Sequence, residues 1–279
     1  MRSAEGSDMR LATIRTGDGT TRAARLDGDR LIPLDAPDAV QALSTGATDG
    51  DAGRAVAFDV ADLAPVVPRP PKIICLGLNY ETHIAEMGRK LPEHPTCFAK
   101  FAIALTGPRD DIVLPAVSSQ VDYEAELAVV IGRPARNVEA HDAKAFIGGY
   151  TILNDVSMRD YQFRTMQWLQ GKTFERSTPL GPVLVTGDEI DDARDLAINC
   201  WVDDDERQAA RTSDLVFPPN DIVAYLSRIM TLEPGDVIST GTPGGVGAGS
   251  DPPRFLAAGQ VLRTRIEGIG ELRNTIVAG

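Results

Sequence analysis

The chain has 279 residues, enough for one large domain or for one large and one small domain. Its 43% hydrophobic and 24% charged residues are ordinary for a soluble globular protein, and its net charge of -12 leaves no basic stripe for nucleic acid. No apolar run approaches the roughly 20 residues that span a bilayer, and residues 1–10 carry no secretion signal. We therefore expect a cytoplasmic protein without membrane or nucleic-acid partners, whose Cys75, Cys97 and Cys200 are buried thiols.

The first part of the chain predicts a small domain of its own. Short apolar stretches over residues 9–35 are separated by tight glycine turns, a pattern typical of small antiparallel strands. The proline-dense segment Pro65-Val66-Val67-Pro68-Arg69-Pro70-Pro71 then indicates a linker. We expect a small N-terminal α+β domain over residues 1–68 and a larger domain over residues 69–279.

A short helix after the linker carries a candidate general base. Residues 72–77 predict a buried strand, and Asn79 and Gly88 are suited to begin and end the helix that follows. His83 and Glu86 are three residues apart and therefore share one face of this helix. A carboxylate beside an imidazole fixes its tautomer and raises its basicity, as a general base requires. The alternative is an ordinary surface His–Glu pair.

The strand predicted over residues 121–132 carries two neighbouring carboxylates. Glu124 and Glu126 are two residues apart, so they project from the same face of a strand. Two carboxylates held this close do not both stay ionised unless a cation lies between them. The pair indicates either a divalent-metal site or an edge strand whose glutamates face water. The several strands close in sequence around it favour a mixed, β-rich α/β fold over a doubly wound sheet.

A second predicted strand, residues 147–154, ends at Asp155, a candidate third oxygen ligand or else a turn residue. The chain has only three histidines and neither His-x-x-x-His nor Cys-x-x-Cys spacing, which argues against a zinc site. Carboxylate ligands instead suit magnesium, manganese or calcium.

The residues after this strand offer polar groups for a substrate. Arg159 and Gln162 are three apart and can together bind a carboxylate or carbonyl. The Gly171-Lys172-Thr173 run is not a nucleotide-binding loop, because the upstream glycine of that motif falls at Met166. Lys172 remains either a functional cation or a solvated lysine.

A glycine-rich loop, residues 241–247, follows another short strand. Such a loop lets the backbone approach a ligand closely, and Thr242 within it could bind an anionic oxygen. The loop is not a dinucleotide-binding fingerprint, because no helix with a following acidic residue comes after it.

Taken together, these motifs resemble those of the fumarylacetoacetate hydrolase superfamily. The resemblance covers roughly residues 71–279 and is nearest to the short acylpyruvase and oxaloacetate decarboxylase-like members. It is carried by five ordered motifs: Gly77-Leu78-Asn79-Tyr80 with His83 and Glu86, Asp122-Tyr123-Glu124-Ala125-Glu126-Leu127, Asn154-Asp155-Val156-Ser157-Met158-Arg159-Asp160, Gly171-Lys172-Thr173-Phe174, and Gly241-Thr242-Pro243-Gly244-Gly245-Val246-Gly247.

The resemblance implies a β-sandwich roll core, a homodimer, and Mg2+ or Mn2+ bound by three carboxylates. It makes Glu124, Glu126 and Asp155 those metal ligands. The remaining roles that it implies are a water-activating dyad on a lid (His83 and Glu86), a polarising cation (Lys172), and substrate contacts (Arg159, Gln162 and Thr242). No role follows for Lys100, because Phe101 stands where many relatives have proline or serine.

The leading hypothesis is a metal-dependent hydrolase that cleaves the C–C bond of a 2,4-diketo acid, as in aromatic catabolism. Water deprotonated by His83 would attack the distal carbonyl, and Lys172 would stabilise the developing oxyanion. The same metal site would also suit an oxaloacetate or other β-keto acid decarboxylase, or an isomerase of a 2-hydroxy-diene-dioate. An alternative from another class is a non-catalytic metal- or ligand-binding protein.

Overall fold

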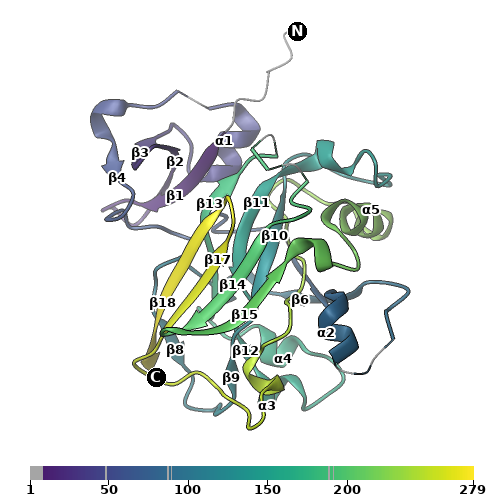
Figure 1. Cartoon of the computed structure of the whole chain (residues 1–279). Coiled ribbons are helices and arrows are strands. Elements are labelled where there is room, and N and C mark those ends of the chain that lie inside the picture. The colour runs from purple at the N-terminus through teal and green to yellow at the C-terminus, as the bar shows by residue number, and fades with distance from the viewer. Residues whose placement is uncertain (1–8, 48, 87, 89, 188, 191) are drawn as a thin grey trace.

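Two β-sheets packed face to face form the body of the molecule (Figure 1). The computed structural model describes residues 9–279 except 48, 87, 89, 188 and 191. In that part of the chain the larger sheet has 11 strands: β4 (Val56–Ala57), β3 (Arg30–Pro33), β2 (Thr21–Asp27), β1 (Arg10–Arg15), β13 (Thr178–Val185), β11 (Ile147–Asn154), β10 (Ala125–Ile131), β16 (Val237–Ser239), β5 (Ile73–Gly77) and β6 (Thr96–Lys100) in spatial order, with β7 (Leu105–Thr106) paired to β13.

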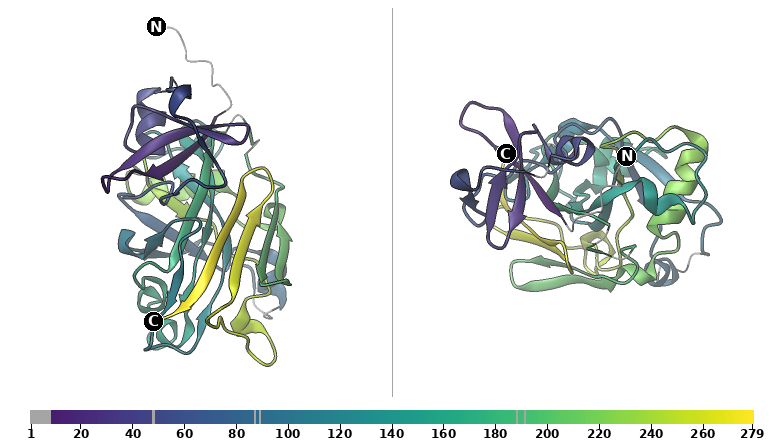
Figure 2. Two further views of the ribbon diagram at one scale, coloured as in Figure 1. Left: turned by 90° about the vertical axis from the view of Figure 1, so that its left-hand side faces the viewer. Right: turned by 90° about the horizontal axis from the view of Figure 1, so that it is seen from above.

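The smaller sheet covers one face of the larger one (Figures 1 and 2). Its strands are β15 (Asp205–Arg211), β14 (Ala197–Val202), β17 (Val261–Ile266), β18 (Gly270–Ala278) and β8 (Ile112–Leu114) in spatial order. A separate ladder joins β12 (Ser157–Met158) to β9 (Val121–Asp122). The predicted mixed, β-rich α/β fold with a sandwich core is confirmed.

Helices are short and lie outside the sheets (Figure 1). They are α1 (Ala39–Thr45), α2 (Glu81–Glu86), α3 (Arg159–Gln162), α4 (Leu169–Lys172) and α5 (Pro219–Ile229). Single 3-10 turns occur at Ala52–Arg54, Ala102–Ala104, Ala143–Phe146, Thr212–Asp214 and Gly247–Gly249.

The alternation of side chains along β10 divides the interior into two cores. One set of residues packs between the two sheets, and the other packs on the outer face of the larger sheet against α1 and the proline-dense segment. The first core includes Leu127, Val129, Ile131, Ile152, Val183, Ile198, Leu262 and Leu272, and the second includes Ala128, Val130, Leu180, Leu184, Val40 and Val66. A strand buried on both faces explains why residues 127–131 form an unbroken apolar run.

Three local predictions are wrong in informative ways. Asn79 does not begin α2; its side chain instead donates to the Phe217 and Thr240 carbonyls and accepts from the Phe217 amide. The strand predicted over residues 121–132 is interrupted at Tyr123 and Glu124. Cys97 is exposed rather than buried. Gly88 does end the helix as predicted, with a φ of 65° that favours glycine.

The N-terminal strands continue the larger sheet. Antiparallel pairing of β1 with β13 sets Arg10 against Val185 and Leu11 against Leu184. These strands lie at one end of the molecule (Figures 1 and 2). The division into domains at residues 1–68 and 69–279 stays a prediction, now with a shared sheet across its boundary.

A partly buried ion pair joins this N-terminal part to the rest of the chain. Arg15 of β1 holds Asp110 through two bonds of 2.9 and 2.6 Å, and Asp110 also accepts from Thr106 and the Gly107 amide. Burial would raise the pKa of Asp110, but the hydrogen bonds from Arg15, Gly107 and Thr106 lower it. The folded protein therefore favours the ionised carboxylate.

We expect Asp110→Asn to lower the free energy of unfolding by about 1–3 kcal/mol at neutral pH, because a charged hydrogen-bond acceptor is lost. The native pKa is depressed, so this contribution is present above the unfolded value and is lost as pH falls through the native one. Urea unfolding of both proteins at several pH values measures the effect. Exposed Asp111→Asn is the control, and equal urea midpoints for wild type and Asp110→Asn would contradict the expectation.

Candidate active site

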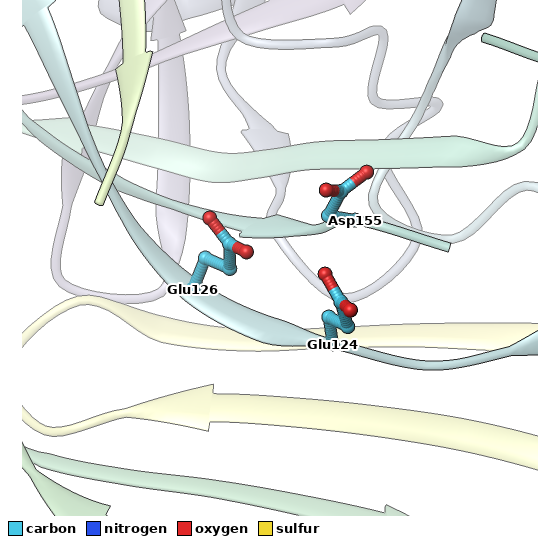
Figure 3. A group of neighbouring side chains, drawn as sticks. All are labelled: Glu124, Glu126 and Asp155. Atoms are coloured by element: carbon cyan, nitrogen blue, oxygen red, sulfur yellow. The ribbon is translucent and has the colours of Figure 1, made fainter. Parts of the chain in front are cut away.

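The three predicted carboxylates meet at one place in the structure. Pairing of β10 with β11 sets Ala125 opposite Asn154 and Glu126 opposite Leu153, so the residues just beyond the paired strands, Glu124 and Asp155, lie next to each other, with Glu126 close by. Glu124, Glu126 and Asp155 each offer an oxygen within 4.8 Å of the others. They turn toward one shared space (Figure 3). Their relative exposures are 7%, 1% and 0%, so the alternative of an edge strand with solvated glutamates is wrong.

The interruption at Tyr123 and Glu124 places the first of these carboxylates. The Glu124 amide donates to the Asn154 side chain at 3.0 Å, and the Asp155 amide donates to the Glu124 carbonyl at 2.8 Å. The backbone groups freed by the interruption are thus satisfied by the same segment that carries Asp155. Glu124 and Asp155 are therefore held as a pair by main-chain bonds.

Three buried cations surround the carboxylates. The Lys172 ammonium lies 2.6 Å from Glu124 and 2.8 Å from Asp155, so the alternative of a solvated lysine is wrong. Lys100 lies 2.5 Å from the other oxygen of Asp155. Arg159 lies 2.7 Å from Glu124 and 2.8 Å from Asp122.

Sequence reasoning gave Lys100 no role, yet it is as buried as the predicted residues. No local sequence signal singles it out, because β6 is an edge strand of the larger sheet and only the structure shows that its last side chain is buried against Asp155. Asp122 was also overlooked. It accepts hydrogen bonds from Arg159 and from the amides of Gly247 and Ala248.

Neighbouring charged side chains determine which of the buried carboxylates are ionised. Burial would raise the pKa of Asp155, but Lys100 and Lys172 hold it at about 2. For Lys172, burial would lower the pKa, but Asp155 and Glu124 raise it above the ordinary value. Arg159 is held charged in the same way by Glu124 and Asp122.

Glu126 differs from its neighbours because only uncharged donors bind it. Its carboxylate accepts from the Ser239 hydroxyl and, at 2.9 Å, from the Gly241 amide. No ammonium or guanidinium group pairs with it among the residues that the structure describes. Burial, followed by repulsion from Asp155 and Glu124, raises its pKa well above the ordinary range.

These residues fit a divalent cation. Hard oxygen donors from three side chains converge, and Glu126 lacks the positive charge that its burial requires. Four buried carboxylates (Asp122, Glu124, Glu126 and Asp155) face three cations (Lys100, Arg159 and Lys172), a net charge of -1 when all are ionised. A divalent cation would change this to +1, which an anionic ligand would offset.

The predicted substrate contacts lie beside this cluster. Gln162 accepts a hydrogen bond of 2.8 Å from Arg159, which orients the guanidinium. Thr242 directly follows Gly241, whose amide binds Glu126. A Cβ on Gly247 of the same loop would lie 2.7 Å from Asp122 Oδ1 and 2.0 Å from the Arg254 carbonyl, so only glycine permits this approach.

The predicted His83–Glu86 pair stays a prediction. His83 is half-buried on α2, and the Glu86 side chain lies outside the described part of the chain. The first turn of α2 is held by a residue far along the chain. Asp214 accepts hydrogen bonds from the Thr82 amide and hydroxyl. This contact fixes the helix that carries His83 without using Asn79.

Comparison with known proteins defines the class. The model of the fumarylacetoacetate (FAA) hydrolase C-terminal family matches residues 72–277. The chain therefore belongs to the fumarylacetoacetate hydrolase family, as its motifs predict.

Individual relatives are similar over most of their length. The chain is 45% identical to rat mitochondrial oxaloacetate tautomerase Fahd2a, over 78% of this chain and 70% of that protein. It is 40% identical to the mitochondrial oxaloacetate tautomerase fahd2 of Xenopus laevis, over 96% of this chain and 90% of that one.

Two solved structures share the whole fold. The fumarylacetoacetate hydrolase of Exiguobacterium antarcticum superimposes with a TM-score of 0.88 at 34% identity, covering 97% of this chain and 100% of that one. The 2-hydroxyhepta-2,4-diene-1,7-dioate isomerase of Mycobacterium marinum gives 0.81 at 35% identity, covering 97% and 98%. No helix in the described residues is long and apolar enough to cross a membrane. The cytoplasmic location and the homodimer stay predictions.

Proposed function

We propose that this protein is a divalent-metal-dependent tautomerase that interconverts the keto and enol forms of a 2-oxo dicarboxylic acid of the oxaloacetate type. The observation that carries the proposal is the buried cluster of three converging carboxylates and three cations. When the buried Asp122 is counted as a fourth carboxylate, a divalent cation would bring the charge of the cluster to +1, which favours an anionic ligand. The rat and Xenopus laevis relatives, at 45% and 40% identity, are named oxaloacetate tautomerases, which supports this choice of substrate and reaction.

The residues of the site would divide the work as follows. Glu124, Glu126 and Asp155 would hold Mg2+ or Mn2+, which when bound supplies a Lewis acid for the 2-keto oxygen. Arg159, oriented by Gln162, would bind the distal carboxylate of the substrate.

Charge and proton transfer fall to two other residues. Lys172 stays protonated beside Asp155 and Glu124 and would stabilise negative charge on the 2-oxygen. We assign proton exchange at C3 to the His83 imidazole, because an imidazole can both accept and donate a proton through its ring nitrogens.

A hydrolase of 2,4-diketo acids is the second candidate. The observation that favours it is the half-buried position of His83 on α2, the first helix after β5, where an imidazole could deprotonate water instead of a substrate carbon. The matched solved fold named fumarylacetoacetate hydrolase is consistent with this chemistry on the same scaffold. Decarboxylation of a β-keto acid would use the same residues without an attacking water.

One set of assays separates these reactions. Enol-oxaloacetate is added to the protein with Mg2+, and the decay of enol absorbance is compared with Mg2+ alone and with EDTA. Carbon dioxide release is followed in parallel, and pyruvate release is followed from a panel of acylpyruvates. We expect protein- and metal-dependent ketonisation that His83→Ala reduces by about 100-fold or more.

Each other result points to a different reaction. Pyruvate release without faster ketonisation would replace the proposal with the hydrolase, and carbon dioxide release would replace it with the decarboxylase. Binding of Mg2+ and oxalate without turnover of any substrate would indicate the non-catalytic alternative.

A further inference from the structure

Gln208 reaches from the smaller sheet to the edge of the carboxylate cluster. It lies on β15 at 1% exposure, one residue after Arg207, where the register with β14 shifts from Trp201–Glu206 to Cys200–Gln208. A bulge of this kind re-aims the side chains next to it. The side chain of Gln208 therefore crosses the space between the sheets.

The carboxamide of Gln208 binds two parts of the site at once. Its oxygen accepts from the amide of Ala125, the residue between Glu124 and Glu126, at 2.9 Å. Its nitrogen donates to the Thr242 hydroxyl at 2.8 Å and to the Pro243 carbonyl at 3.0 Å.

These partners fix the orientation of the amide without ambiguity. The Ala125 N–H can only donate, so the atom facing it must be the oxygen of Gln208. The Pro243 carbonyl can only accept, so the atom facing it must be the nitrogen. Exchange of the two atoms would leave both ends of the amide facing the wrong partner.

This orientation determines what the Thr242 hydroxyl can do. Because Gln208 donates to Thr242 Oγ1, the hydroxyl accepts that bond and its own proton must point elsewhere. Thr242 makes no other side-chain hydrogen bond with the residues that the structure describes. Its neighbour Gly241 contacts Glu126, so this proton is available at the rim of the cluster.

The loop that carries Thr242 packs closely against the β-bulge at Arg207. Gly245 has a φ of 94°, and a Cβ there would lie 1.9 Å from the Arg207 carbonyl. Tyr123 donates from its hydroxyl to the Gly245 carbonyl at 3.1 Å. The geometry between Gln208 and Thr242 is therefore supported on both sides.

We propose that Gln208 is a positioning residue that holds the Thr242 hydroxyl as a hydrogen-bond donor to a carboxylate of the substrate. The inference rests on the proposed function for the identity of the ligand, a 2-oxo dicarboxylate. It adds a residue from the other sheet to substrate recognition, and it explains why a glutamine rather than an apolar residue is buried there.

Gln208→Glu tests the polarity of this bond. Glutamate keeps an acceptor for Ala125 but has no N–H for Thr242, so the Thr242 proton would turn toward it and away from the substrate. We expect KM for oxaloacetate to rise about ten- to hundredfold, with a smaller change in kcat and no weakening of Mg2+ binding by calorimetry. Thr242→Val should raise KM by a similar factor.

The double variant distinguishes positioning from a structural role. If Gln208 acts through Thr242, Gln208→Glu combined with Thr242→Val is no worse than either alone. Gln260→Glu is the matched control, because Gln260 also accepts from a backbone amide, that of Ala257, away from the cluster. Effects that multiply, an unchanged KM, or weakened Mg2+ binding in Gln208→Glu would overturn the inference.

The same variants remain informative if the proposed function fails. A wild-type protein that turns over no oxaloacetate counts against the tautomerase, and titration of oxalate into the Mg2+-loaded protein then supplies the readout. Weaker oxalate binding in Gln208→Glu and Thr242→Val, without additivity, supports the inference on Gln208. Unchanged oxalate binding in both would overturn it.

Discussion

Replacing Glu126 by glutamine is expected to stabilise the metal-free protein while abolishing its use of a divalent cation. Glutamine keeps an acceptor for the Ser239 hydroxyl and the Gly241 amide, so the local hydrogen bonds survive. It removes a buried negative charge that Asp155 and Glu124 repel. We expect a gain of roughly 1–3 kcal/mol in unfolding free energy at neutral pH, together with a loss of at least about 100-fold in metal affinity and activity.

The prediction also specifies how the unfolding free energy of the metal-free protein changes with pH. The pKa of Glu126 in the folded protein is raised above its ordinary value of 4.5, so the folded state binds more protons than the unfolded state above that value. Stability of the metal-free wild type therefore falls as pH rises from about 4.5, and Glu126→Gln should lack this part of the slope.

Thermal and urea unfolding in EDTA, with Mg2+ titration by calorimetry, measure both effects. Exposed Glu233→Gln serves as the control. A Glu126→Gln protein that is less stable than wild type in EDTA, or that still binds Mg2+ with wild-type affinity, would show that Glu126 is not the uncompensated ligand.

The carboxylate ligands could be predicted from sequence because their positions follow from strand geometry. Glu124 and Glu126 are two residues apart at the start of an apolar run, and Asp155 ends another run. Both patterns survive even though β10 starts one residue later than Glu124. Carboxylates two residues apart still lie close together despite this interruption, because pairing with β11 fixes the register of the segment.

Contacts between distant segments could not be predicted in this way. Gln208 lies 83 residues from Ala125, and nothing in its local sequence indicates a bond to that amide. Asn79 was assigned to a helix start by its type, but the carbonyls of Phe217 and Thr240 compete for the same side chain. Lys100 needed the knowledge that Asp155 lies opposite the end of β6.

Replacing Asp155 by asparagine is expected to have the opposite effect on stability from the change at Glu126, although both remove a ligand. Asp155 is the shared partner of Lys100 and Lys172, and all three side chains are buried. Asparagine would leave Lys100 without a carboxylate and Lys172 with Glu124 alone. Loss of one member of a buried ion pair costs about 3–5 kcal/mol, because the remaining charge is uncompensated.

Urea unfolding of the metal-free proteins measures this cost. The contribution of Asp155 to the unfolding free energy also depends on pH in a predictable direction. The pKa of Asp155 is depressed from 3.8 to about 2, so its contribution is present above pH 3.8 and is lost as pH falls to about 2. The difference between wild type and Asp155→Asn should shrink across that range. Adding Lys100→Met to Asp155→Asn removes the stranded charge and should recover much of the stability without restoring metal binding. A single variant as stable as wild type, or a double variant less stable than the single one, would mean that the two lysines do not depend on Asp155 for their burial.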